Sequence, residues 1–196
     1  PGHDPDVVGE GANLGVTPRA RVQYARRGGR IDQDAVHNAA GVDISDHEVN
    51  LKILLAIAES DDRIDRDERN AHLAEVSDDV VAHVLRDVDR QAAQLSRLAA
   101  SSQERLDDLR TLLDELESRE VVDRDVDVLP DHDELDERAS VGAGLTRPEL
   151  ATLMAGAKRV VSEAVRASSL PEDPVVAEVV GTYLPARLET AFGDLV

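Results

Sequence analysis

The chain has 196 residues, enough for one or two domains with an apolar core, and carries a formal net charge of -19. Most of this charge lies in residues 59–140, where 26 acidic residues face 11 arginines. An acidic surface repels phosphate backbones and anionic lipids, so we expect no nucleic-acid and no membrane binding. The chain has no Cys and no run long and apolar enough to span a bilayer, and we expect a cytoplasmic protein.

The first elements in chain order are a strand end and a helix. A short apolar run at residues 6–10 is closed by glycine and predicts the end of a strand. Thr17 and Pro18 then supply an N-cap and a proline at the first helical position, and the helix they open is expected to end at Gly28 and Gly29. The chain begins at Pro1 without an initiator Met, and we expect it to be the tail of a longer protein.

Residues 38–48, Asn-Ala-Ala-Gly-Val-Asp-Ile-Ser-Asp-His-Glu, are the most informative stretch. A glycine-containing turn stands directly before Ser45 and Glu48, which have the spacing of a capping box. The sequence therefore predicts that a helix begins at Ser45, with free backbone N–H groups that attract a carboxylate. Apolar residues then follow nearly all round this helix as far as Ala58, so we expect it to be buried on most sides.

From residue 59 onward the pattern is helical throughout. Ser77 is expected to cap a long helix that ends at a Ser101-Ser102 break, and a second leucine stripe follows in residues 106–116. Two such helices with a short joint predict an antiparallel hairpin. Thr146 and Glu149 form a second capping box before another helix, and one or two short helices are expected between residues 174 and 196.

Three further patterns are weaker than they look. Residues 9–15 imitate a dinucleotide fingerprint, but Leu14 stands where the third glycine is required. Acidic residues at 123–134 have EF-hand spacing, but Val128 replaces the turn glycine, so an acidic linker before a helix is the favoured interpretation. The histidines show no metal-binding spacing, and we expect no metal site.

Two motifs together resemble a known family. Residues 38–48 resemble the substrate-binding motif of glutamate dehydrogenases, Asn-Ala-Gly-Gly-Val-x-x-Ser-x-x-Glu, with Ala40 as the only departure. Residues 10–13 are similar to the Glu-Gly-Ala-Asn loop of the same enzymes, whose Asn approaches the nicotinamide ribose. The connecting residues and later stretches, such as residues 144–151, look like the large multidomain NAD-specific enzymes of bacteria.

The resemblance implies oxidative deamination of L-glutamate to 2-oxoglutarate and ammonia, with NAD as the hydride acceptor. It implies cofactor contacts at Asn13 and Asn38, and substrate contacts at Gly41, Val42 and Ser45, with Ser45 at the side-chain carboxylate. The catalytic Lys and Asp of the family and its Gly-rich pyrophosphate turn lie upstream. No catalytic residue is therefore expected in this segment, which alone should be inactive.

The fold expected from these features is mainly α, with an N-terminal remnant of an α/β Rossmann-like dehydrogenase domain followed by a helical C-terminal domain. Residues 1–58 would be the end of the catalytic region and residues 59–196 the helical domain. The resemblance also implies a homo-oligomer. The alternative is a non-enzymatic acidic helical module for interaction or oligomerisation, which composition alone would favour, but which has no need of the motif at residues 38–48.

Overall fold

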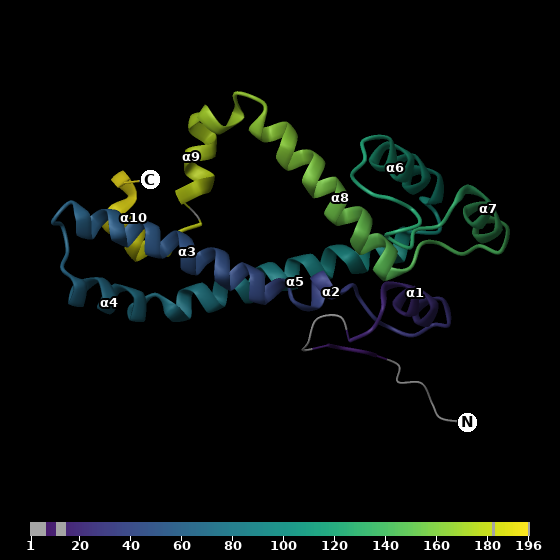
Figure 1. The fold of residues 1–196 in the computed structure, drawn as a ribbon, viewed down its shortest axis with the longest axis horizontal. Helices are drawn as coiled ribbons and strands as arrows, with labels where there is room; N and C mark the ends of the chain where they lie inside the picture. The colour runs from purple at the N-terminus through teal and green to yellow at the C-terminus, as the bar shows by residue number, and fades with distance from the viewer. Residues whose placement is uncertain (1–6, 11–14, 182, 196) are drawn as a thin grey trace. The chain divides into compact units, whose positions relative to one another are not determined.

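The computed structural model describes residues 7–10, 15–181 and 183–195, and over these residues the chain is helical (Figure 1). Sheet pairing among them is limited to one parallel bridge between Val7 and Arg30, where the Val8 amide donates to the Arg30 carbonyl at 2.8 Å. The mainly α prediction is confirmed. The Rossmann-like remnant and the strand at residues 6–10 are not evident in the described part of the chain, because a single bridge does not make a sheet.

The helices fall into two compact units. Unit 1 contains the described residues up to Asn38 together with Arg90–Ala164, and unit 2 contains Ala39–Asp89 together with the described residues from Val165. Helix α5, Ser77–Ser101, contributes its first half to unit 2 and its second half to unit 1. Each unit therefore combines residues from both sides of position 58, and a domain boundary at that position stays a prediction.

Unit 1 is built around leucines from α5 and the helices that follow it. Its helices are α1 (Pro18–Arg26), α2 (Asp34–His37), α6 (Leu106–Ser118), α7 (His132–Ser140) and most of α8 (Arg147–Arg166). Leu95 packs in one cluster with Leu106 and Leu113, as expected for helices joined at the Ser101-Ser102 break. The remaining buried members are Leu109, Leu116, Val122, Leu129, Leu135, Leu145, Leu150, Ala151 and Leu153.

The predicted start and end of α1 are both confirmed. The Thr17 hydroxyl accepts a hydrogen bond from the Ala20 amide at 3.3 Å, and Pro18 occupies the first helical position. Gly28, just beyond the helix, has a φ of +91°, which L-residues with a side chain rarely adopt. These are local signals, and they needed no tertiary contact to be read correctly.

Buried ion pairs join the segments of unit 1. Arg138 of α7 and Glu149 of α8 are 3% and 1% exposed and meet through two hydrogen bonds of 2.7 and 2.8 Å. Burial alone would lower the pKa of Arg138, but Glu149 and Glu134 raise it above its ordinary value. Glu149 also accepts from the Thr146 amide at 2.6 Å, so half of the predicted second capping box is present.

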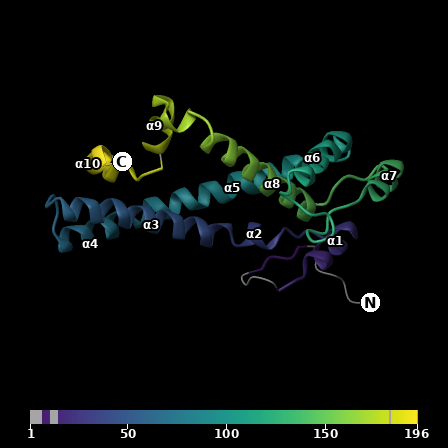
Figure 2. The same cartoon turned by 45° about the horizontal axis from the view of Figure 1, so that its top comes forward.

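Unit 2 consists of α3 (Ala39–Ser60), α4 (Arg66–Glu75), the first half of α5, η1 (Leu170–Glu172), α9 (Pro174–Gly181), α10 (Ala186–Phe192) and η2 (Gly193–Leu195). Helix α3 runs beside α4 and the beginning of α5, which follow one another end to end, in both views of the ribbon (Figures 1 and 2). Their core includes Leu51, Leu55 and Val84 from these helices and Leu188 and Phe192 from α10.

A capping box in unit 2 was not predicted, and a predicted cap is absent. The Asp65 side chain accepts from the amides of the first turn of α4 while Glu68 accepts from the Asp65 amide at 2.9 Å. Ser77, expected to cap α5, instead donates its hydroxyl to the Leu73 carbonyl at 2.9 Å. Helix α4 ends so close to α5 that the Ser77 side chain completes the preceding turn.

Helix α3 buries only part of its apolar surface. Leu51, Leu54, Leu55 and Ala58 face the core of unit 2 and are at most 4% exposed. A second stripe of apolar side chains, here called the outer stripe, lies along α3 at intervals of one or two turns. It consists of Val42, Val49, Ile53 and Ile57, which are 38–65% exposed. The prediction that α3 is buried on most sides therefore holds for one face only.

Candidate functional site

Helix α3 begins at Ala39, six residues before the predicted start at Ser45. The Ser45 hydroxyl does not cap the helix but donates to the Gly41 carbonyl at 3.0 Å, one turn back within the same helix. No residue between 39 and 44 breaks a helix, since Gly41 weakens one by only about 1 kcal/mol. The capping-box prediction is wrong for this reason, and the free N–H groups lie in the first turn, around Ala39–Val42.

The structure places the three expected substrate residues on one side of α3. At 100° per residue, Gly41, Val42 and Ser45 lie within about 100° of one another around the helix axis. All three are exposed, and Val42 is 65% exposed. Asn38 is the C-cap residue of the four-residue helix α2. Asn13, the second expected cofactor residue, lies outside the described residues.

Glu10, the first residue of the second motif, belongs to a buried ion cluster. Its carboxylate forms an ion pair with Arg21, which is 1% exposed, and lies 3.4 Å from Nδ1 of His37. Burial raises the pKa of Glu10, but hydrogen bonds and charge from Arg21 and His37 lower it overall. Arg21 also donates to the carbonyls of Val16 at 3.1 Å and Asp32 at 2.8 Å. Arg21 of α1 therefore bonds to residues that precede the helix and to residues that follow it.

A cluster of aromatic and imidazole rings lies one turn further along α3. His47 is 1% exposed, and its ring stacks on Tyr183 with a centroid distance of 4.2 Å and meets His83 edge-on at 4.8 Å. The Tyr183 hydroxyl donates to Asp46 at 2.6 Å and accepts from Asn50 at 3.2 Å. Burial and the nearby Asp46 raise the pKa of Tyr183 to about 12.

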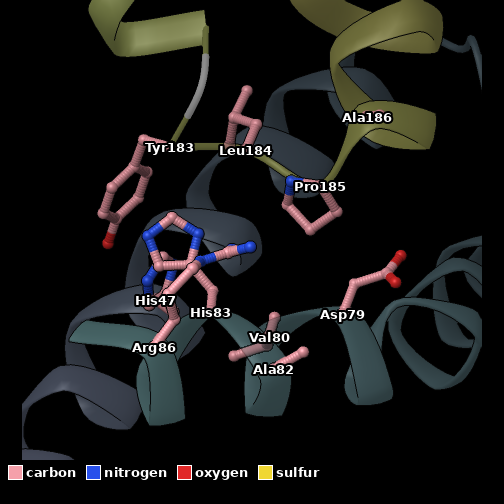
Figure 3. A pocket seen from close by; sticks show the side chains of 10 residues that line it. All are labelled: His47, Asp79, Val80, Ala82, His83, Arg86, Tyr183, Leu184, Pro185 and Ala186. Atoms are coloured by element: carbon pink, nitrogen blue, oxygen red, sulfur yellow. The ribbon is translucent and has the colours of Figure 1, made fainter. Parts of the chain in front are cut away.

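This ring cluster borders a pocket of about 260 Å³ within unit 2 (Figure 3). In the close-up, His47, His83 and Arg86 gather beneath Tyr183, while Asp79 stands at the opposite end beyond Val80. The segment that leads from Tyr183 into α10 forms the other wall. The pocket is too small for a dinucleotide and of a size that fits a compact ligand.

Sequence reasoning missed Arg21, His47 and Tyr183 as members of clusters. Tyr183 and Asp46 are 137 residues apart, and no local pattern announces their pairing. In the sequence His47 is one of several histidines without metal-binding spacing. The usable signal was its position, because it shares the inward side of α3 with Leu51 and Leu54.

The acidic segment at residues 123–134 uses its carboxylates locally. Asp123 accepts from the amides of Asp125 at 2.9 Å and Val126 at 3.0 Å, and Asp131 caps α7 through the Glu134 amide at 2.7 Å. Across the described residues, no group of three or more His, Asp or Glu side chains is arranged to hold a metal ion. Nor is any described helix both long and apolar enough to cross a membrane.

Comparison with known proteins assigns both ends of the chain. Residues 4–98 match the family described as bacterial NAD-glutamate dehydrogenase, catalytic domain, and residues 142–196 match the family described as glutamate dehydrogenase, C-terminal. The chain is 41% identical over 189 residues to an NAD-specific glutamate dehydrogenase of Pseudomonas aeruginosa. It is 38% identical over 188 residues to that of Halomonas elongata and 40% identical over 186 residues to that of Mycobacterium tuberculosis.

These matches include 95–96% of this chain but only 12% of each relative. The chain therefore spans about an eighth of the length of the curated relatives that it matches. Both family matches and all three relatives agree with the resemblance read from residues 10–13 and 38–48. The chain belongs to the bacterial NAD-specific glutamate dehydrogenase family.

Proposed function

We propose that this chain is part of a longer enzyme that oxidises L-glutamate to 2-oxoglutarate and ammonia and passes the hydride to NAD. The observation that carries the proposal is the match of residues 4–98 to the catalytic domain of the family, which includes both sequence motifs. The catalytic Lys and Asp would come from elsewhere in the longer protein. The 196 residues alone should therefore produce no NADH from glutamate above a blank, and production by the purified chain would contradict this.

The proposed substrate contacts are Gly41, Val42 and Ser45 at the beginning of α3. The free N–H groups of the first turn carry the positive end of the helix dipole, which favours a carboxylate. Ser45 lies on the same side of the helix, and its hydroxyl can turn from the Gly41 carbonyl toward an acceptor in solution. In this arrangement Val42 would contact the methylenes of glutamate, and Ser45 its side-chain carboxylate.

The test is Ser45→Ala in the full-length enzyme. Loss of a charge-assisted hydrogen bond, about 1.5–3 kcal/mol, should raise the glutamate KM about tenfold or more and leave the KM for NAD nearly unchanged. Because Ser45 lies inside α3 rather than at its end, the melting temperature should stay the same or rise slightly. Ser60→Ala, at the other end of the same helix, is the matched control and should leave both KM values unchanged.

We also propose cofactor contacts at Asn13 and Asn38, with Asn13 at the nicotinamide ribose. Asn13→Ala should weaken the binding of NAD more than the binding of glutamate, which is the reverse of the effect expected for Ser45→Ala. Steady-state kinetics on both variants decide between the roles. An unaltered glutamate KM in Ser45→Ala would contradict the proposed contact between Ser45 and the substrate. Equal changes of the KM for NAD and the KM for glutamate in Asn13→Ala would contradict a specific contact between Asn13 and the cofactor.

The final element of the proposal is a homo-oligomeric enzyme. It rests on the family alone, since the structure holds one chain. Light scattering of the full-length protein after size exclusion tests it directly, and a mass equal to one chain would contradict it.

A further inference from the structure

The pocket beside His47 is lined by donors that have no hydrogen-bond partner among the described residues. Neither ring nitrogen of His47 has a hydrogen-bond partner, although the residue is 1% exposed and one nitrogen lies 3.9 Å from the carboxylate of Asp43. A neutral imidazole always carries one N–H, so one buried donor is left without an acceptor. Such a group carries an unfavourable free energy that a ligand with an acceptor oxygen would remove.

A second donor lines the same pocket. Arg86 of α5 borders it, and among the described residues no carboxylate or carbonyl pairs with its guanidinium. Two other arginines of unit 2 have carboxylate partners, Arg63 with Asp194 at 2.8 Å and Arg69 with Glu59 at 3.3 Å, whereas the exposed Arg66, like Arg86, has none among the described residues. Arg86 is exposed, so its guanidinium is accessible to a ligand at the edge of the pocket.

The other polar groups of the pocket are already engaged or stand apart. His83 directs Nε2 toward Asp87 at 3.4 Å, and the Tyr183 hydroxyl donates to Asp46. Asp79 lies at the far end of the pocket, away from His47 and Arg86 (Figure 3). Asp43, Asp46 and Asp87 adjoin the donor end, and the last two are engaged by Tyr183 and His83. Asp79 at the far end would exclude a ligand with a second negative charge there.

From these observations we infer that the pocket binds the oxyanion of a small ligand, a phosphate or a carboxylate, between the guanidinium of Arg86 and the imidazole N–H of His47. A guanidinium presents a planar fork of donors that matches both kinds of oxyanion. The volume of about 260 Å³ admits a compact acid or a phosphate group and not a dinucleotide. The site is separate from the proposed substrate contacts, because His47 and Ser45 are two residues apart on α3 and point about 160° apart.

The experiment follows the melting temperature of the full-length protein, without NAD or glutamate, while inorganic phosphate or acetate replaces chloride at constant ionic strength. Wild type should show a saturable rise with at least one of the two probes, since a ligand that binds only the folded state stabilises it. Arg86→Gln should weaken the apparent affinity at least tenfold. Arg66→Gln, at an exposed position on α4 of the same unit, is the matched control and should behave as wild type.

The variants separate this pocket from any other anion site of the longer protein, including the proposed substrate site. Arg86→Lys keeps the charge but loses the fork, and should bind more weakly than wild type and more tightly than Arg86→Gln. Saturation by phosphate alone assigns a phosphate ligand, and by acetate alone a carboxylate ligand. An equal response of wild type and Arg86→Gln, or no response of wild type to either probe, overturns the inference.

Discussion

The most deeply buried charged side chains of unit 1 form ion pairs with one another, whereas unit 2 buries a histidine that has no hydrogen-bond partner among the described residues. In unit 1, Arg138 meets Glu149, and Arg21 meets Glu10, each pair between segments that are separate in the sequence. In unit 2 the buried His47 has no hydrogen-bond partner. Exposed large apolar residues occur in both units, with Val126, Val141 and Val161 among those of unit 1, and in unit 2 four of the five exposed on α3 form the outer stripe. The two units therefore differ in the pairing of their most deeply buried polar side chains and in the outer stripe of α3.

The largest expected effect breaks the matched charges of unit 1. Arg138→Met removes the guanidinium and leaves the carboxylate of Glu149, 1% exposed, without its counter-charge. Breaking a buried ion pair in this way destabilises a protein by about 3–5 kcal/mol. Urea unfolding of the 196-residue chain, followed by circular dichroism, measures the loss. Arg119→Ala removes a surface pair with Glu115 and should change the free energy of unfolding by about 0–1 kcal/mol. Equal effects of the two variants would mean that the buried pair is not closed in solution.

The second effect compares the two faces of α3. Leu55 is fully buried, so Leu55→Ala should destabilise the 196-residue chain by about 2–5 kcal/mol through lost contacts and a cavity. Ile53 belongs to the outer stripe and is 53% exposed, so Ile53→Ala should stay within about 0.5 kcal/mol. A large effect at Ile53 in this chain would contradict the exposure of the outer stripe.

The same pair of variants in the full-length protein sharpens this comparison. The chain spans only 12% of its relatives, and the remainder of the longer protein is available to cover the outer stripe. If it does, Ile53→Ala becomes destabilising there while Leu55→Ala keeps its effect. An Ile53→Ala variant that is neutral in both proteins would leave the outer stripe in solvent in both.

The smallest effect concerns the ring cluster of unit 2 and depends on pH. The pKa of Tyr183 is raised in the folded state to about 12, above its ordinary value of about 10. The stabilisation linked to this shift is therefore fully present below pH 10 and is lost as the pH rises from about 10 to 12. Tyr183→Phe should cost about 1 kcal/mol at neutral pH and flatten this part of the stability profile. Thermal melts of both proteins between pH 9 and pH 11.5 measure the difference, and parallel profiles would contradict the assignment.

The sequence predicted those parts of the fold that depend on neighbouring residues. Thr17, Pro18 and Gly28 act within a few residues of one another, and their helix begins and ends as expected. The break after Ser101 is equally local, and the two helices on either side pack through Leu95 and Leu106. Residues 10–13 and 38–48 pointed to the family that the comparisons then showed.

Ser45 shows where local reading fails. A serine followed three residues later by glutamate fits a helix start, but the same spacing also fits a helix interior, where Ser45 bonds back to Gly41 and Glu48 pairs with Lys52. The two cases differ in the backbone angles of the preceding residues, which side-chain identity does not set. Long-range pairs are a second limit, because Arg138 with Glu149 and Tyr183 with Asp46 form only once separate helices have packed.

The outer stripe also has a consequence for the colloidal behaviour of the 196-residue chain. A net charge of -19 keeps molecules apart at low ionic strength, where the screening length is about 10 Å at 0.1 M salt. At 1 M salt this length falls to about 3 Å, and exposed Val49, Ile53 and Ile57 can then approach the same residues of another molecule. Sulfate also strengthens apolar association. Ammonium sulfate should therefore precipitate the chain at a lower concentration than its net charge alone would suggest.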